Sequence, residues 1–316
     1  MDCILITGGA GFIGSHIADY LCKQNMYKRI RIVDNLSSGK MNNIQYLLDN
    51  YNNIEFIYGD ISNLEICKKV VSGMSVICHQ AAVGSVPRSI IDPLTTHISN
   101  VNGFLNILIA SKEAGIKRII YASSSSVYGD NNSLPKIENN TGNVLSPYAA
   151  SKAIDEIYAN VFTKCYGMEC IGLRYFNVFG PRQDPNGAYA AVIPKFIMLM
   201  KQGKSPTFNG DGCFSRDFTY IDNVVEANIL ALTTENKYCF GEAFNIGTRG
   251  QITILDLFDS IKTELKCDIE PIFGDTREGD IPHSNADINK AKIMLGYEPK
   301  ILFEEGIKLL CNFQNV

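Results

Sequence analysis

Residues 4–14 read Ile-Leu-Ile-Thr-Gly-Gly-Ala-Gly-Phe-Ile-Gly, an apolar run that leads directly into a glycine-rich turn. Its glycines match the pattern G-x-G-x-x-G and the related pattern G-x-x-G-x-x-G. Glycine in such a turn allows a tight bend and lets the backbone approach a pyrophosphate at the start of a helix. The stretch predicts a strand, a dinucleotide-binding turn and a helix. The residues expected at the cofactor are Gly8, Gly11, Phe12, Ile13 and Gly14.

The next apolar run ends at Asp34, about 20 residues after Gly14, where an acidic residue would bind the adenosine ribose. A carboxylate at this point repels a 2′-phosphate, and the neighbouring Asn35 offers no positive charge. The sequence therefore favours NAD over NADP. Asp60 and Ile61 follow a third apolar run and are expected near the adenine, with an ordinary turn aspartate as the alternative.

Apolar runs alternate with amphipathic segments over the first half of the chain. Strands are expected at 3–7, 30–34, 54–59, 75–79, 118–122 and 170–175, and helices at 13–22, 64–71, 102–113 and 148–166. This alternation predicts an α/β fold with a Rossmann-like, doubly wound parallel sheet over residues 1–175. Residues 176–316 should form a smaller α/β lobe with helices near 191–201, 223–233 and 254–265. Segments near 215–247 are candidates for returning to the first domain.

Composition excludes several classes of protein. The 316 residues include 29 Lys and Arg against 33 Asp and Glu, a net charge of −4, with 46% hydrophobic and 20% charged residues. Without a basic block, neither nucleic acid nor an anionic membrane is an expected partner. No apolar run reaches the ~18 residues that span a bilayer. The chain starts with a strand rather than a signal peptide, so a cytoplasmic enzyme with reduced cysteines is expected. The four histidines are not spaced as metal ligands.

A second motif combines serines, a tyrosine and a lysine. Ser124 lies in a run of four serines after the fifth expected strand, and Tyr148 and Lys152 are four residues apart, on one face of a helix. Tyrosine has an ordinary pKa of about 10, and the positive charges of a lysine and of a nicotinamide would favour its phenolate. This arrangement indicates a tyrosine base. A surface Tyr/Lys pair, and another serine of the run, remain as alternatives.

Together these residues resemble the extended short-chain dehydrogenase/reductase family, and within it the nucleotide-sugar 4-epimerases. The resemblance extends from Gly8 to about Tyr297. Besides the motifs above, it depends on 79–82 (His-Gln-Ala-Ala), 100–103 (Asn-Val-Asn-Gly), 173–182 (Leu-Arg-Tyr-Phe-Asn-Val-Phe-Gly-Pro-Arg), 216–218 (Arg-Asp-Phe) and 277–280 (Arg-Glu-Gly-Asp).

The resemblance implies a role for each residue of the site. Ser124 and Tyr148 would face the 4-hydroxyl of the sugar, and Lys152 would hold the nicotinamide ribose. Further cofactor contacts would come from Gln80, Ala81, Ala82 and Asn100. Asn177 would bind the diphosphate or sugar, Arg216 and Arg277 the pyrophosphate, Asp280 the uridine ribose, and Phe208 the uracil. The remaining substrate contacts would be Gly84, Ser85, Ser125, Ala191, Val192 and Asn209.

The implied reaction is oxidation at carbon 4 by a tightly bound NAD, rotation of the keto sugar, and return of the hydride to its other face. Related 4,6-dehydratases carry Asp-Glu where this chain has Ser125 and Ser126. Related decarboxylases carry Glu at the position of Ser126. The two serines therefore weaken the case for a dehydratase and for a decarboxylase. The serine run recurs in 4-epimerases of UDP-uronates, so such substrates stay open.

Ser284 suggests the substrate. In 4-epimerases restricted to plain hexoses a tyrosine stands four positions after the aspartate of Arg-Glu-Gly-Asp, and this chain has Ser284 there. The smaller side chain leaves room for a 2-acetamido group, and segments 84–89 and 183–189 also resemble enzymes of N-acetylated sugars. The hypothesis is interconversion of UDP-N-acetylglucosamine and UDP-N-acetylgalactosamine. A position for Ser284 far from the sugar is the alternative.

Other functions and the oligomeric state remain open at this point. The alternatives are a UDP-glucose or UDP-uronate 4-epimerase, an NAD-linked oxidoreductase or dehydratase that releases a changed product, and a non-catalytic NAD-binding regulatory protein. The resemblance also implies a homodimer through a four-helix seam built from helices 102–114 and 148–166. Their apolar residues could equally belong to the core. These residues are Phe104, Leu105, Leu108, Ile154, Ile157 and Val161.

Overall fold

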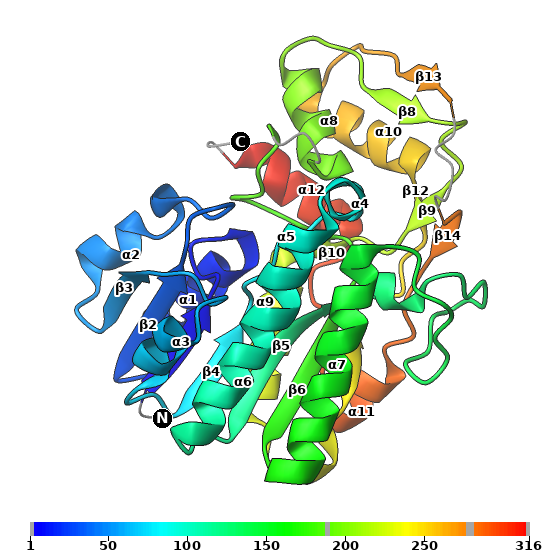
Figure 1. The fold of residues 1–316 in the computed structure, drawn as a ribbon. Coiled ribbons are helices and arrows are strands. Elements are labelled where there is room, and N and C mark those ends of the chain that lie inside the picture. The colour runs from blue at the N-terminus through cyan, green and yellow to red at the C-terminus, as the bar shows by residue number, and fades with distance from the viewer. Residues whose placement is uncertain (1–2, 187–189, 276–280, 314–316) are drawn as a thin grey trace.

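The structure is a computed structural model that describes residues 3–186, 190–275 and 281–313. A seven-stranded parallel sheet forms its centre (Figure 1). In spatial order the strands are β11 (Ala243–Ile246), β6 (Glu169–Tyr175), β5 (Arg118–Ser124), β4 (Val76–His79), β1 (Cys3–Thr7), β2 (Arg29–Asp34) and β3 (Ile54–Tyr58). The predicted Rossmann-like α/β class is confirmed, and the six predicted strands are found within a few residues of their expected bounds.

Helices cover both faces of this sheet (Figure 1). On one face lie α3 (Leu64–Val71), α6 (Gly103–Glu113) and α7 (Pro147–Tyr166), and on the other lie α1 (Phe12–Lys23), α9 (Ile221–Thr233) and α11 (Asn289–Leu295). Successive strand residues point to opposite faces, so Leu5 joins one hydrophobic core while Ile4 and Ile6 join the other. Burial on both faces explains why the strands are almost continuously apolar.

The chain leaves the sheet after β6 and builds a smaller lobe, which gathers at one end of the molecule in Figure 1. This lobe contains α8 (Val192–Lys201), α10 (Ile254–Leu265), α12 (Phe303–Asn312) and the paired strands β8 (Thr207–Asn209) and β13 (Ile272–Gly274). A three-stranded sheet of β12 (Ile252–Thr253), β9 (Ser215–Arg216) and β14 (His283–Ser284) lies beside it. Between these parts, α9 and β11 return to the large sheet.

Several short elements complete the chain and were not expected from the sequence. They are α2 (Gln45–Asn50), α4 (Val86–Ile91), α5 (Pro93–His97), a π-helical turn at Ile98–Asn102, 3₁₀ turns at Met41–Asn43, Ser125–Tyr128 and Lys237–Cys239, and the paired strands β7 (Val178–Phe179) and β10 (Thr219–Tyr220). No helix of the described residues is long and apolar enough to cross a membrane. All ten cysteines are free thiols.

The helices proposed for a dimer seam divide their apolar residues between core and surface. Phe104 and Leu108 of α6 are fully buried inside the subunit. Ile157 and Val161 of α7 are 63% and 42% exposed. Helix α7 therefore exposes apolar side chains that a partner could cover.

Asp217, directly after β9, fastens the smaller lobe to the return segment. Its carboxylate is fully buried and accepts four hydrogen bonds, from the amide and hydroxyl of Thr248 (2.8 and 2.7 Å), the amide of Arg249 (3.0 Å) and the amide of Ala286 (3.1 Å). Three segments far apart in sequence thus meet at one side chain. The aspartate of the Arg-Asp-Phe motif is a structural residue.

Replacing Asp217 by alanine should lower the free energy of unfolding by about 4 kcal/mol, because four buried donors lose their acceptor. Urea titration followed by circular dichroism measures this loss. Asp211→Ala is the matched control: Asp211 is exposed and accepts from the amide of Cys213, so its removal should cost at most about 1 kcal/mol. Equal losses in the two variants would contradict this account of Asp217.

Candidate active site

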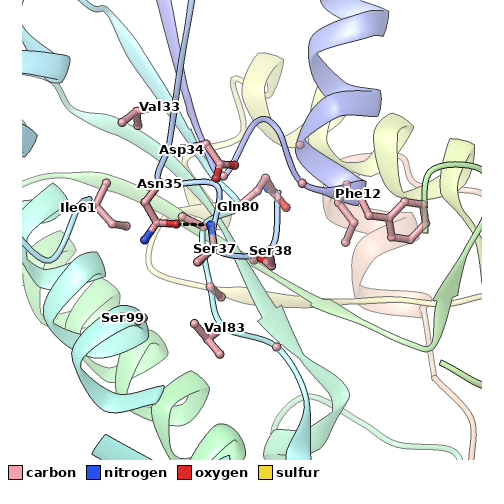
Figure 2. A pocket seen from close by; sticks show the side chains of 18 of the residues that line it. Phe12, Val33, Asp34, Asn35, Ser37, Ser38, Ile61, Gln80, Val83 and Ser99 are labelled. Atoms are coloured by element: carbon pink, nitrogen blue, oxygen red, sulfur yellow. Dashed lines mark hydrogen bonds between the residues drawn. The ribbon is translucent and has the colours of Figure 1, made fainter. Parts of the chain in front are cut away.

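A cavity of about 310 Å³ opens at the carboxyl ends of β1, β2, β4 and β5 (Figure 2). In an open parallel sheet this edge is where ligands bind. Most of the residues predicted to contact the cofactor line this cavity: Gly8, Gly11, Phe12, Ile13, Gly14, Asp34, Asn35, Asp60, Ile61, Gln80, Ala81, Ala82, Tyr148 and Lys152. Gly84, predicted for the substrate, lines it as well.

The glycine turn has the geometry that a pyrophosphate requires. Gly8 has a φ of +66°, and a side chain there would come within 2.7 Å of the backbone of Ala81. A side chain on Gly14 would lie 2.4 Å from the carbonyl oxygen of Gly8. Helix α1 starts after Gly11, and no side chain caps its first amide groups. These amides can therefore donate to an anion at the positive end of the helix dipole.

Asp34 lines the cavity at the end of β2. Its carboxylate accepts from the amides of Ala10 (3.0 Å) and Leu36 (2.8 Å), and burial raises its pKa although these amides act in the opposite direction. The side chain of Asn35 donates to Asp60 at 3.0 Å. Figure 2 shows Asp34 and Asn35 beside each other at the end of β2. A carboxylate in this place suits ribose hydroxyls, so the residues present fit NAD.

Asn228 of α9 supports the floor of the cavity from behind. Gln80 and Tyr175 line the cavity, and both bond to Asn228 of α9. The side chain of Gln80 donates to the Asn228 carbonyl at 3.0 Å, and the Asn228 amide donates to the Tyr175 hydroxyl at 2.9 Å. Asn228 is fully buried. The return segment therefore helps to shape the cofactor cavity.

Helix α7 carries Tyr148 and Lys152 and is held firmly. The Ser146 side chain accepts from the Ala149 amide at 3.1 Å and caps its start, and Gly167, with a φ of +65°, ends it. Along its length, Glu156 accepts both arms of the Arg174 guanidinium (2.8 and 2.7 Å) and the hydroxyl of Ser123 (2.6 Å). These bonds fix α7 against the ends of β5 and β6.

Tyr148 is half-buried and Lys152 almost fully buried, and both side chains reach the cavity. The Lys152 ammonium donates to the carbonyl of Ala122 at 3.0 Å and to Asp155 at 3.2 Å. Ser124 lies at the end of β5 and accepts from the Ser126 amide at 3.1 Å; Ser124 and Ser125 are half-buried and do not line the cavity. Within the serine run, Ser123 lines it.

Other predicted site residues stand behind or beside the cavity. Asn100 is fully buried, and its side-chain oxygen Oδ1 accepts from the Val83 amide at 2.8 Å. Asn100 therefore supports the cavity wall from behind. Ser85, with a φ of +102°, caps α4. Asn177, with a φ of +31°, donates to the carbonyl of Asp217 at 3.3 Å. None of the three lines the cavity.

Phe208, expected at the uracil, lies in the smaller lobe. Its ring is 1% exposed and belongs to the core of the smaller lobe. It stacks on Phe196 with ring centroids 5.5 Å apart, and Phe258 and Phe273 approach it edge-on. These ring contacts hold Phe208 in place within the smaller lobe. A contact between Phe208 and a uracil stays a prediction.

The remaining substrate residues lie on the smaller lobe. Arg216 and Ser284 are register partners on the paired strands β9 and β14, and the Arg216 guanidinium donates to the carbonyls of Ser215 (2.9 Å) and Pro282 (3.1 Å). Ala191 is exposed before α8, Val192 is half-buried in its first turn, and Asn209 is exposed at the end of β8. The predicted residues Arg277 and Asp280 lie outside the described residues.

The cavity also contains residues that the sequence did not single out: Val33, Ser37, Ser38, Gly59, Val83, Ser99, Ala122, Ser123 and Tyr175. Most adjoin a predicted residue in the chain, so strand-end position alone could have indicated them. Ser99 comes from the π-helical turn, next to the predicted residue Asn100.

Comparison with known proteins identifies the family. The family model described as "NAD dependent epimerase/dehydratase family" matches residues 4–247. The chain belongs to this family. A curated relative, a putative UDP-glucose 4-epimerase of Methanocaldococcus jannaschii, is 41% identical over 98% of this chain and 97% of its own length. The family's cofactor, NAD, is the one that the glycine turn and Asp34 fit.

Two solved structures are similar over nearly the whole chain. A UDP-N-acetylglucosamine 4-epimerase from Methanobrevibacter ruminantium, in complex with UDP-N-acetylmuramic acid, has a TM-score of 0.91 and 40% identity, and covers 98% of this chain and 97% of that one. A UDP-glucuronic acid 4-epimerase from Bacillus cereus, in complex with UDP-glucuronic acid and NAD, has a TM-score of 0.90 and 32% identity, with 98% of each chain covered.

Proposed function

We propose that this NAD-dependent epimerase family member inverts carbon 4 of a UDP-sugar, and that it interconverts UDP-N-acetylglucosamine and UDP-N-acetylgalactosamine. The observation that carries the reaction type is one cavity lined by the glycine turn, Asp34, Tyr148 and Lys152. Relatives named as UDP-sugar 4-epimerases, at 40–41% identity over nearly their full length, support the substrate class.

The residues suit the chemistry of such a reaction. When bound, NAD supplies the acceptor and then the donor of the hydride at carbon 4. Tyr148, as phenolate, takes the proton of the 4-hydroxyl and returns it after inversion. The Lys152 ammonium, anchored on the Ala122 carbonyl, favours the phenolate by its charge. Ser124 is the proposed second contact to the 4-hydroxyl.

Arg216 would hold the diphosphate while the keto sugar turns. Guanidinium groups match phosphate oxygens in a two-point geometry, which fixes one end of the substrate and leaves the sugar free to rotate. Arg277 and Asp280 are proposed to complete this anchor. Pairing of β14 with β9 brings Ser284 next to Arg216. This register supports a place for Ser284 in the sugar pocket, where its small side chain would admit an acetamido group.

The purified enzyme, supplied in parallel with UDP-N-acetylglucosamine, UDP-glucose and an N-acetylated UDP-uronate, tests the proposal. NMR should show UDP-N-acetylgalactosamine forming to equilibrium, without accumulation of free NADH. Turnover of UDP-glucose alone would overturn the acetamido assignment, and turnover of the N-acetylated uronate alone would overturn the assignment of a neutral sugar. Stoichiometric NADH would indicate an oxidoreductase, and bound NAD without any turnover a regulatory protein.

The proposed enzyme is a homodimer whose seam includes α7. The exposed Ile157 and Val161 support this, because exposed apolar side chains on one helix are typical of a subunit interface.

A further inference from the structure

Asp155 stands directly behind the proposed catalytic pair. Tyr148, Lys152 and Asp155 are spaced four and three residues apart, which places them along one face of α7. The carboxyl group of Asp155 is 1% exposed, and its Oδ2 lies 3.2 Å from the Lys152 ammonium nitrogen. Its other oxygen, Oδ1, has no hydrogen-bond partner among the described residues. A buried carboxylate that uses half of its capacity is costly to a fold.

The titratable groups on the strands beside Lys152 do not offset its charge. On β4, His79 bonds to the Thr7 hydroxyl at 2.9 Å, and burial together with the charge of Lys152 lowers its pKa to about 3, so it is neutral. On β5, burial raises the pKa of Tyr121 well above its ordinary value. Both are therefore uncharged near pH 7.

The charged neighbours on α7 and β6 neutralise each other. Glu156 adjoins Asp155, but both of its oxygens accept from Arg174 of β6. Helix α6 presents Phe104, which packs between His79 and Tyr121. Within the described part of the chain, Asp155 is the carboxylate that bonds to Lys152.

We propose that Asp155 is a positioning residue that holds Lys152 and partly cancels its charge, and thereby sets the pH at which Tyr148 becomes a base. The inference rests on the proposed role of Tyr148 and is independent of which UDP-sugar is turned over. A full positive charge on Lys152 favours the phenolate, whereas a carboxylate behind it opposes the phenolate. Removing the carboxylate should therefore let Tyr148 lose its proton at lower pH.

The influence of Asp155 on Lys152 depends on the protonation of Asp155 itself. Burial raises the pKa of Asp155 to about 6, against the opposing influence of Lys152. Above this pH the carboxylate is charged and offsets Lys152. Below it the group takes up a proton and the offset disappears, which sustains the phenolate as the solution becomes acidic.

Asp155→Asn tests the proposal, because it keeps the shape and removes the charge. The acid-side midpoint of the kcat/KM profile should move down by about one pH unit, measured with whichever UDP-sugar the wild type turns over. Asp155→Ser, a smaller neutral variant, should shift it likewise, and Asp155→Glu should retain the wild-type midpoint. The control Asp259→Asn removes an exposed carboxylate from α10 and should shift nothing.

A spectroscopic readout needs no turnover. The tyrosinate absorbance of each background minus that of the same background with Tyr148→Phe isolates the titration of Tyr148. This titration should also move to lower pH in Asp155→Asn. If Asp155 were merely structural, kcat would fall at every pH with both midpoints unchanged. Unchanged midpoints, or midpoints at higher pH, would overturn the proposal even if the wild type proves inactive on every UDP-sugar.

Discussion

Replacing Tyr148 by phenylalanine should lower kcat by about a thousandfold, because the variant lacks the group that takes and returns the proton of the 4-hydroxyl. The substitution removes one oxygen from a half-buried side chain, and the bonds of Ser146 and Glu156 that fix α7 do not involve this oxygen. The folded protein and its bound NAD should therefore be preserved. Initial rates by NMR, NAD content after gel filtration and the melting temperature measure the three quantities separately.

The matched control is Tyr166→Phe at the other end of the same helix. Tyr166 is 50% exposed and packs its ring against Phe162, so losing its hydroxyl should leave kcat within about twofold of wild type. Near-normal turnover in Tyr148→Phe would remove the base assignment. Loss of turnover together with loss of NAD would show that the hydroxyl serves binding rather than proton transfer.

The second large effect concerns substrate choice. Ser284→Tyr should lower kcat/KM for UDP-N-acetylglucosamine by about a hundredfold, because a bulky ring would occupy the space proposed for the acetamido group. UDP-glucose lacks that group and should keep its kcat/KM within about threefold. Ser284 is half-buried on β14, beside Arg216 of β9, so the new ring would enter the lobe next to the diphosphate anchor.

Parallel kinetics with both sugars decide this prediction, and Ser284→Ala is its control. The alanine variant keeps the space and should retain both activities. An equal loss of both substrates in Ser284→Tyr would mean that the ring disturbs the anchor or the fold, and would contradict the pocket argument. Unchanged use of the acetylated sugar would place Ser284 away from it.

The parts of the fold that the sequence predicted are those with a local cause. The glycine turn follows from backbone geometry within a few residues, and the six strands follow from apolar runs that are buried on both faces. The seventh strand, β11, could not be predicted in this way. It has four residues and pairs with β6, about 70 residues earlier in the chain, so its position depends on a long-range contact.

The same distinction applies to the site. Asp34 was found because its distance from the glycine turn is fixed by one strand–helix–strand unit. The role of Asp217 could not be predicted, because an aspartate that binds a ligand and one that links three segments look alike in a sequence. Asp155 gains its meaning from burial beside Lys152, which no spacing rule reveals.

The position of Asn228 has a consequence for how the protein is made. Residues 1–175 leave the ribosome first and contain the glycine turn, Asp34, Tyr148 and Lys152. Their sheet still has a bare edge at β6, and the hydroxyl of Tyr175 still lacks Asn228. The nascent first half is therefore an unfinished cofactor cavity with an exposed strand edge, the kind of edge that invites aggregation. The cavity floor and the covered edge at β6 are complete only when α9 and β11 have docked.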